Sequence, residues 1–185
     1  MIVGLTGKYA AGKGTVAEVL LRGGFQYHSL SDIIREELAA SGQAESREAL
    51  LAMGNTLRHE GGPGVLAQRL LERVKTGDHI VDSIRNPAEV AALRTLDGFT
   101  LVAVDADARV RFERLKQRAR IGDPTEWETF AELEARESKS DDPRAQQVAA
   151  TLALADRVVM NDGDLGALEA SVAELLAELR GRAAR

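Results

Sequence analysis

A glycine-rich stretch near the N-terminus, residues 7–15 with the sequence GKYAAGKGT, limits what this chain can fold into more than any other feature. It follows a short apolar run at residues 2–5, which predicts a strand, and it leads into residues 15–22, whose pattern predicts a helix. Glycines between a strand and a helix permit a tight loop whose backbone N–H groups point inward, and the helix N-terminus adds partial positive charge. This context predicts a phosphate-binding loop in which Lys13 places its ammonium on the outer phosphates.

One position of the loop departs from the common pattern. The strict form has Ser or Thr directly after the lysine as a magnesium ligand, whereas Gly14 occupies that place here and Thr15 follows it. We therefore expect Thr15 to be the metal-binding hydroxyl. The loop residues expected to bind ATP are Gly7, Ala10, Ala11, Gly12, Lys13, Gly14 and Thr15.

The rest of the chain alternates short apolar runs with longer helical patterns, which is typical of strand–helix–strand units and a parallel sheet. We expect strands at residues 2–5, 25–28, 79–84, 99–104 and 157–160. We expect helices at residues 15–22, 31–40 with Ser31 as the N-cap, 46–59, 65–75, 108–120, 148–154 and 165–179, and one that begins near Pro87. The predicted fold is a single α/β domain spanning residues 1–185, a three-layer sandwich whose five-stranded parallel sheet is flanked by helices.

Composition excludes several classes of protein. With 24 Lys and Arg against 29 Asp and Glu, the net charge of −5 argues against a nucleic-acid-binding surface. The absence of cysteine excludes disulfides and thiolate metal sites, and the three scattered histidines lack metal-ligand spacing. Neither a signal-peptide pattern nor an apolar run of about 18–20 residues occurs, so we expect a cytoplasmic protein that binds no membrane. The sequence leaves the oligomeric state open.

The GKGT ending of the loop is the variant found in adenylate and cytidylate kinases. On this motif the chain resembles the P-loop nucleoside monophosphate kinases and their relative dephospho-CoA kinase. The resemblance implies a phosphotransferase that uses ATP and Mg²⁺ and acts on a small-molecule nucleotide. It also implies a helical acceptor-binding region at about residues 30–76 and a mobile helical lid region at about residues 112–146.

Residues 27–35, YHSLSDIIR, resemble the segment after the second strand of adenylate kinases. There an arginine one turn into the helix grips the acceptor phosphate, and Arg35 is the matching position. Asp32 lies beside it and is the nearest candidate for a general base if the acceptor is a hydroxyl, as in dephospho-CoA kinase. Residues that could line the acceptor pocket are Met53, Asn55, Arg58 and Gln68, of which Met53 fits the core better and Arg58 is retained as acceptor-binding.

Residues 80–85, IVDSIR, resemble the third-strand motif of these kinases, an Asp followed three residues later by Arg. The resemblance implies that Asp82 holds magnesium through water and that Arg85 lies beside both phosphates, where it spreads the transferring charge. The alternative for Asp82 is a structural one, in which it caps the helix that begins near Pro87.

Arginines crowd the predicted helix at residues 108–120 and its exit. In the resembling kinases the equivalent helix leads into a lid that closes over ATP and brings arginines onto the phosphates. Arg114 and Arg118 are the best lid candidates, Arg120 and Arg136 are weaker ones, and Arg109 and Arg111 are expected on a solvated helix face. Residues 122–144 lack the lid hairpin of adenylate kinases, which counts against that particular enzyme.

Residues 155–163, ADRVVMNDG, resemble the C-terminal end of dephospho-CoA kinase, where a loop after the last strand lies along the adenine ring. Asn161 and Gly163 are therefore expected to bind ATP. The alternative is an ordinary turn between a strand and a helix.

Three functions remain open at this point. The first is a kinase for a nucleoside or deoxynucleoside monophosphate, with Lys13, Asp82, Arg85 and Arg118 as catalytic residues. The second is dephospho-CoA kinase. The third is a nucleotide-binding regulatory module or slow NTPase, because residues 82–90 and 146–156 also resemble the kinase-like domain fused to some dCMP deaminases.

Overall fold

The computed structural model describes residues 1–119, 123–138, 142 and 144–183. Within them lies a five-stranded sheet in the order β2-β3-β1-β4-β5, with every neighbouring pair parallel. The strands are β1 (Ile2–Gly7), β2 (Gln26–Ser29), β3 (His79–Asp82), β4 (Phe99–Asp105) and β5 (Arg157–Met160). The all-parallel five-stranded sheet confirms the predicted fold class.

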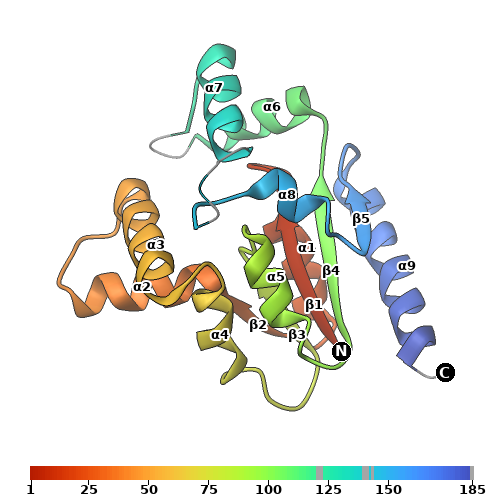
Figure 1. Ribbon diagram of the computed structural model, residues 1–185. Coiled ribbons are helices and arrows are strands. Elements are labelled where there is room, and N and C mark those ends of the chain that lie inside the picture. Colours follow the sequence, from red (N-terminus) through yellow and green to blue (C-terminus); the bar gives the residue numbers. More distant parts are fainter. Residues whose placement is uncertain (120–122, 139–141, 143, 184–185) are drawn as a thin grey trace.

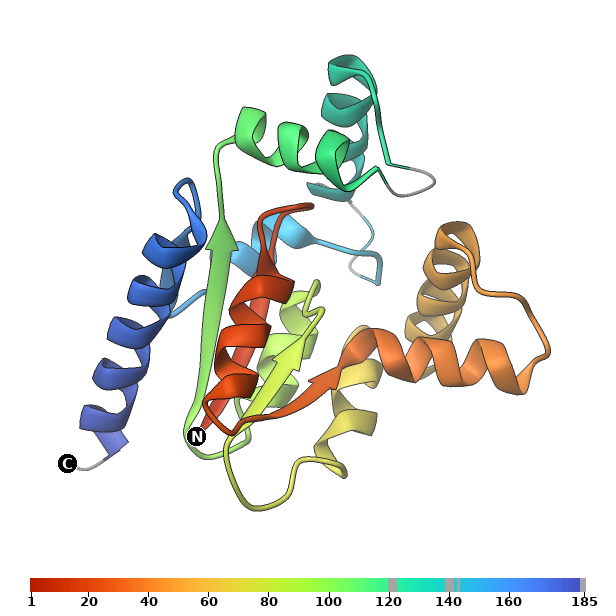
Figure 2. The same cartoon turned by 180° about the vertical axis from the view of Figure 1, so that it is seen from behind.

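Helices cover both faces of the sheet (Figures 1 and 2). Helices α1 and α9 lie on one face, α5 and α8 lie on the other, α2 to α4 extend from the β2 side, and α6 and α7 lie beyond the carboxyl ends of the strands. The helices are α1 (Lys13–Arg22), α2 (Leu30–Ala40), α3 (Arg47–Gly61), α4 (Val65–Leu71), α5 (Pro87–Leu93), α6 (Ala108–Arg118), α7 (Trp127–Ser138), α8 (Val148–Leu152) and α9 (Leu165–Ala183). No helix in the described part of the chain is long and apolar enough to cross a bilayer.

Alternate strand side chains divide the core into two layers. Val3 and Leu5 of β1 belong to a cluster with residues of α1 and α9, whereas Ile2 belongs to a cluster with residues of α2 to α5. Because successive side chains of a strand point to opposite faces, a strand buried on both sides needs apolar residues at nearly every position. The whole of β1 is buried, which explains why its sequence is a continuous apolar run rather than an alternating one.

Several boundaries differ from the predicted ones for local reasons. Ser29, not Ser31, is the N-cap of α2, since β2 runs directly into the helix and the Ser29 hydroxyl accepts from the backbone N–H of Ser31. Strand β3 ends at Asp82 because Ser83 adopts a left-handed backbone with φ 66°. Helix α6 ends at Arg118, where Ala119 adopts φ 45°.

The N-terminus of α5 rules out the structural alternative for Asp82. Asn86 is the N-cap, its side-chain oxygen accepts from Ala88 N–H, and the Glu89 carboxylate accepts a hydrogen bond from the Asn86 backbone N–H. Pro87 occupies the first turn, as predicted. Asp82 therefore does not cap this helix and lies apart from it at the end of β3.

Candidate active site

The loop between β1 and α1 closes around the side chain of Lys13. Its ammonium donates hydrogen bonds to the carbonyl oxygens of Gly7, at 2.7 Å, and Lys8, at 3.0 Å. Glycine is required at position 7, because a Cβ there would lie 2.2 Å from the carbonyl oxygen of Val104 on β4. The loop therefore curls tightly against the sheet with the lysine ammonium inside the curve.

The far side of the loop packs against the segment after β5. The Asn161 carboxamide donates to the carbonyl oxygen of Ala11 at 2.9 Å. Gly12 adopts φ 99°, and a Cβ there would lie 2.1 Å from Asn161 Nδ2. Arg114 reaches the same segment, with Nη2 3.4 Å from Asn161 Oδ1 and 3.5 Å from the Gly163 carbonyl oxygen, while its Nη1 is buried without a hydrogen-bond partner. The structure thus brings together Arg114, Asn161 and Gly163, three residues that the sequence assigns to ATP.

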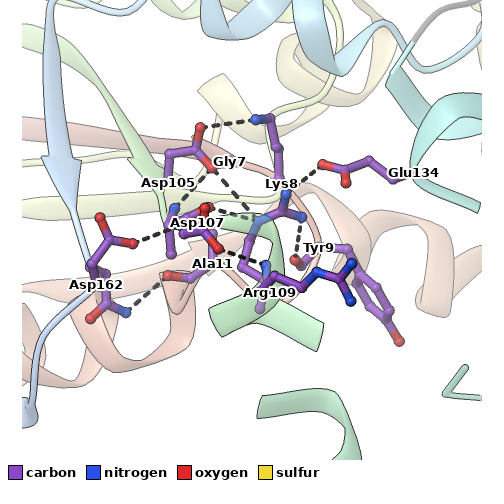
Figure 3. A network of polar contacts seen from close by, with 12 residues as sticks. Gly7, Lys8, Tyr9, Ala11, Asp105, Asp107, Arg109, Glu134 and Asp162 are labelled. Atoms are coloured by element: carbon purple, nitrogen blue, oxygen red, sulfur yellow. Dashed lines mark hydrogen bonds and ion pairs between the residues drawn. The ribbon is translucent and has the colours of Figure 1, made fainter. Parts of the chain in front are cut away.

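Two carboxylates flank the loop, because the strands on either side of β1 both end in aspartate. Asp82 ends β3, is 9% exposed, and accepts from the Tyr27 hydroxyl at 2.9 Å and from Ser83 N–H at 2.6 Å. Asp105 ends β4 and forms an ion pair with Lys8 at 3.1 Å (Figure 3). Burial, together with the adjacent Asp82 carboxylate, raises the pKa of the Tyr27 phenol, so Tyr27 remains a hydrogen-bond donor at neutral pH.

A small pocket of about 30 Å³ lies over the loop and is lined by Lys13, Arg85 and Glu134, among others. Arg85 follows β3 and donates from Nη1 to Gln146 Oε1 at 3.1 Å. Glu134 belongs to α7 and therefore lines the pocket from the lid region.

The structure contradicts the expectation that Arg111 lies on a solvated helix face. Arg111 is 1% exposed and lies among the loop, β4 and α7. Its guanidinium donates to the carbonyl oxygens of Ala106, at 2.9 Å, and Tyr9, at 3.3 Å, and to the Glu134 carboxylate at 2.7 Å. Position 111 lies on the inward face of α6, so the helix turns this cation toward the phosphate-binding loop. Arg109 is exposed, as expected, with its guanidinium 3.7 Å above the Trp127 ring.

Arg118, the other predicted lid arginine, lies at the tip of the loop. It donates from Nε and Nη2 to the two Asp123 oxygens, each at 2.9 Å, and from Nη2 to the Tyr9 hydroxyl at 3.1 Å. The Tyr9 hydroxyl in turn donates to Asp123. Arg118 is thus held beside Tyr9, which lines the pocket, by the hydroxyl of this tyrosine and by a carboxylate of the lid region. Arg120 lies outside the described residues, as does the side chain of Arg136.

The residues predicted for the acceptor do not converge. Arg35 donates to Asp32 at 2.8 Å and to Glu45 at 3.1 Å on the partly exposed surface of α2. The burial of Arg58 contradicts the expectation that this residue binds the acceptor. Arg58 is 2% exposed, because its position on α3 faces α5. Its Nε and Nη2 donate to the fully buried Glu89 of α5.

A larger pocket of about 330 Å³ lies between α3 and the segment before α8. It is lined by Asn55 and His59 of α3 and by Arg144, whose Nη1 lies 2.8 Å from His59 Nδ1. Asn55 is one of the possible pocket residues that the sequence indicates, whereas Met53 packs against the core, as expected. The sequence does not indicate His59 and Arg144, because no pattern shows that residues so far apart lie side by side.

The oxygen-bearing side chains near the loop fit a metal ion that is coordinated mainly by phosphate oxygens and water. Thr15 lies in the first turn of α1, and Asp82 and Asp105 lie at the ends of the two neighbouring strands. Among the described residues, no three His, Asp or Glu side chains gather closely enough to hold a metal ion by themselves. Such sparse protein coordination suits Mg²⁺, which keeps several waters and binds through substrate phosphates.

Comparison with known proteins assigns the chain to a family. The AAA domain model AAA_18 matches residues 3–139. The UPF0200 protein of Hyperthermus butylicus is 32% identical, with 98% of this chain and 96% of the relative aligned, and that of Thermococcus kodakarensis is 33% identical, with 97% and 98% aligned. The chain belongs to the UPF0200 family and to the AAA_18 domain family.

Solved structures similar to this UPF0200 chain carry the same fold. TT1252 from Thermus thermophilus aligns with a TM-score of 0.61 at 22% identity, over 97% of each chain. The shikimate kinase of Bacteroides thetaiotaomicron aligns with a TM-score of 0.61 at 17% identity, over 97% of this chain and 98% of that one. At these identities the likeness establishes a P-loop kinase-type fold for the UPF0200 chain and leaves its substrate to be argued from the site.

Proposed function

We propose that this chain is an ATP-dependent phosphotransferase whose acceptor is a nucleoside or deoxynucleoside monophosphate. The observation that carries the proposal is the placement of Lys13 and Arg85 on one small pocket over the glycine-rich loop. Two cations on a shared pocket can neutralise the charge that develops on a transferring phosphoryl group.

The donor side of the site is assigned to the loop and to the segment after β5. Lys13 binds the outer phosphates together with the backbone of residues 7–15. The Arg114, Asn161 and Gly163 contacts support a place for the base and sugar of ATP against the other flank of the loop. Arg118 lies beside Tyr9, a lining residue of the pocket, and would contact the phosphates after releasing Tyr9 and Asp123.

Thr15 and Asp82 are the residues that would hold magnesium. A bound Mg²⁺ supplies charge neutralisation on the phosphate oxygens. Tyr27 and Ser83 fix the Asp82 carboxylate by hydrogen bonds at 2.9 and 2.6 Å, so this group is oriented before any ligand arrives. Oriented groups need no reorganisation during the reaction, which lowers its barrier.

The acceptor side is assigned to α2, α3 and the larger pocket. Arg35 is the proposed ligand of the acceptor phosphate, and it would have to release Asp32 and Glu45 to act. The polar pocket at Asn55, His59 and Arg144 is wide enough for a base or sugar and offers amide, imidazole and guanidinium groups. Arg85 lies between the two sides and would contact both phosphates.

A phosphoryl-transfer assay tests the proposal. Purified protein with Mg²⁺ and ATP is offered each nucleoside monophosphate, each deoxy counterpart and dephospho-CoA, and ADP release and the phosphorylated product are measured together. We expect one monophosphate class to be consumed. Lys13→Ala should lower the rate by about two orders of magnitude or more, because it removes a charge that contacts the transferring group.

The outcomes separate the alternatives. Phosphorylation of dephospho-CoA alone would assign the second function. ATP that binds tightly, with slow ADP release and no phosphorylated acceptor, would contradict the kinase and favour a nucleotide sensor or slow NTPase.

A further inference from the structure

A buried carboxylate holds the backbone of Arg85 from behind the phosphate pocket. Glu89, in the first turn of α5, is 0% exposed. Its Oε2 accepts from the backbone N–H groups of Arg85, at 2.8 Å, and Asn86, at 3.0 Å. Its Oε1 accepts from Nε and Nη2 of Arg58 on α3, at 3.1 and 2.8 Å. One side chain therefore joins the turn that carries Arg85 to the helix that lines the larger pocket.

The same turn is also held from the side of the lid region. The Arg85 carbonyl oxygen accepts from Gln147 N–H at 2.8 Å, and Asn86 Nδ2 donates to the Ala145 carbonyl oxygen at 2.8 Å. The Arg85 guanidinium itself donates to Gln146. Glu89 of α5 and residues 146–147 thus contact Arg85 directly, and α3 is joined to this turn through the Arg58–Glu89 ion pair.

Helix capping alone does not account for this arrangement. A glutamate of a capping box normally lies at the surface, where water solvates its free oxygen. Here the carboxylate is fully buried against a buried guanidinium, and Arg58 Nη1 remains without a hydrogen-bond partner. Apolar residues of similar size often stabilise a fold as well as such an ion pair does. A contribution to stability alone therefore does not explain why a charged pair occupies this position.

We propose that Glu89 is a positioning residue for Arg85. By accepting the Arg85 N–H it fixes the turn from which the guanidinium faces the terminal phosphate of ATP, and Arg58 sets the orientation of the Glu89 carboxylate. The inference rests on the proposed function, because it requires nucleotide phosphates in the pocket over the loop.

The test compares two double variants that both remove the ion pair. Arg58→Met/Glu89→Gln keeps a side-chain oxygen that can accept the Arg85 N–H, whereas Arg58→Met/Glu89→Leu does not. Arg85→Ala serves as the reference for a lost guanidinium. Val90→Ala, a truncation of the buried neighbour on α5, is the control for a merely destabilised helix. Isothermal titration calorimetry gives the ATP and ADP dissociation constants of each protein without relying on turnover.

In wild-type protein we expect ATP to bind more tightly than ADP, since only ATP reaches Arg85. This preference should fall about tenfold in Arg85→Ala, as expected for one lost charge-assisted hydrogen bond. The leucine double variant should lose as much of its preference for ATP over ADP as Arg85→Ala does, while its ADP affinity stays unchanged. The glutamine double variant and Val90→Ala should keep the wild-type preference.

Two results overturn the inference alone. One is a leucine double variant that keeps the wild-type ATP preference, and the other is a glutamine double variant that loses as much of it as the leucine one. If the leucine double variant does not fold, Arg58→Met/Glu89→Met replaces it, since the unbranched methionine side chain likewise offers no oxygen to the Arg85 N–H, and an unchanged preference then overturns the inference. A wild-type protein that binds no nucleotide contradicts the proposed function itself.

Discussion

Gly12 shows how closely single residues of the phosphate-binding loop are constrained. Its φ of 99° and the 2.1 Å that would separate a Cβ at this position from Asn161 Nδ2 leave no room for a side chain. We expect Gly12→Ala to lower the free energy of unfolding by about 1–3 kcal/mol, because it combines backbone strain with the loss of the Asn161 contact. Denaturant unfolding measures the change.

Gly14 provides the matched control two residues away. A Cβ there meets nothing within 4 Å, and the residue lies inside α1. Gly14→Ala should leave the free energy of unfolding unchanged or raise it by up to about 1 kcal/mol, because alanine favours the helix. Equal losses in the two variants would show that the clash at Gly12 does not matter.

We expect His28 to make the stability of the fold depend on pH. Its Nε2 lies 3.1 Å from Nδ1 of His79. Burial, followed by the charges of His79 and Arg73, lowers the pKa of His28 below 6.5. The unfolded chain therefore binds more protons than the folded one between the lowered pKa and about 6.5, so stability should fall as the pH drops through that window and stay level above it.

The check is a series of unfolding measurements from about pH 5 to about pH 8 on wild-type protein and His28→Gln. The variant should flatten the dependence below about pH 6.5. His59→Gln, the same change on an exposed ring, is the control. A wild-type slope that survives in His28→Gln would assign the effect to other groups.

Individual residues could be predicted where the signal is local. The loop containing Lys13 is marked by its own neighbours in the sequence, and Asp82 by its place in an apolar strand. Asp105 carries the same signal, since it directly follows the apolar run of β4. The burial of Arg111 and Arg58 could not be read from the sequence, because helical arginines are usually solvated and only the packing of distant elements decides otherwise.

At the scale of elements, α7 brings a negative charge to the small pocket over the glycine-rich loop. Glu134 lines that pocket together with Lys13 and Arg85. We expect Glu134→Gln to tighten ATP binding by about fivefold, since a carboxylate several ångströms from the phosphates opposes them by about 1 kcal/mol. Glu132→Gln, an exposed change on the same helix, should leave the affinity unchanged.

Calorimetric titration of ATP distinguishes the two variants. Weaker binding in Glu134→Gln would contradict the expectation. It would mean that the carboxylate contributes more by holding Arg111 against the loop, through their 2.7 Å contact, than it costs by repelling phosphate.

Element types could be predicted more securely than their ends. Each of the five strands overlaps a predicted one. Four of them contain a compact apolar run, whereas β2 is the polar segment QYHS, which the glycines at residues 23 and 24 separate from the helix before it. The ends depended on contacts that the sequence does not display, such as the left-handed Ser83 that stops β3 and the direct passage of β2 into α2 at Ser29. Helix α7 lies in a polar stretch, and its few apolar side chains pack on Phe112 and Leu115 of α6, a contact that the sequence does not display.

At the scale of the whole molecule, the apolar core is unevenly distributed. Two large clusters cover the faces of the sheet, whereas the buried members of the cluster between α6 and α7 are Phe112, Leu115 and Phe130. Local opening costs least where few apolar contacts are broken. We expect amide hydrogen exchange in α6 and α7 to be faster than in β1 and β4, and ATP to slow it in these helices most strongly.

Mass-spectrometric exchange with and without ATP makes the comparison, with Lys13→Ala as the control that should show no ATP-dependent change. Uniform protection across the sheet and α6 and α7 would contradict the expectation that this part opens separately.

The overall fold could be predicted because alternating strands and helices permit few topologies. The strand order β2-β3-β1-β4-β5 could not, since pairing between strands is non-local and a single sequence does not display the register. The larger pocket between α3 and the segment before α8 escaped prediction for the same reason, because His59 and Arg144 meet only after the chain has returned from α7.

Trp127 is the only tryptophan in the chain, and it lies at the start of α7 between Arg109 and the rings of Phe112 and Phe130. Intrinsic fluorescence excited at the indole band therefore reports on this one corner of the protein, without any attached dye. Because the Arg109 guanidinium is stacked on the Trp127 indole, the emission should change when this guanidinium moves away. The protein thus contains its own optical probe of whether α6 and α7 move when a ligand arrives.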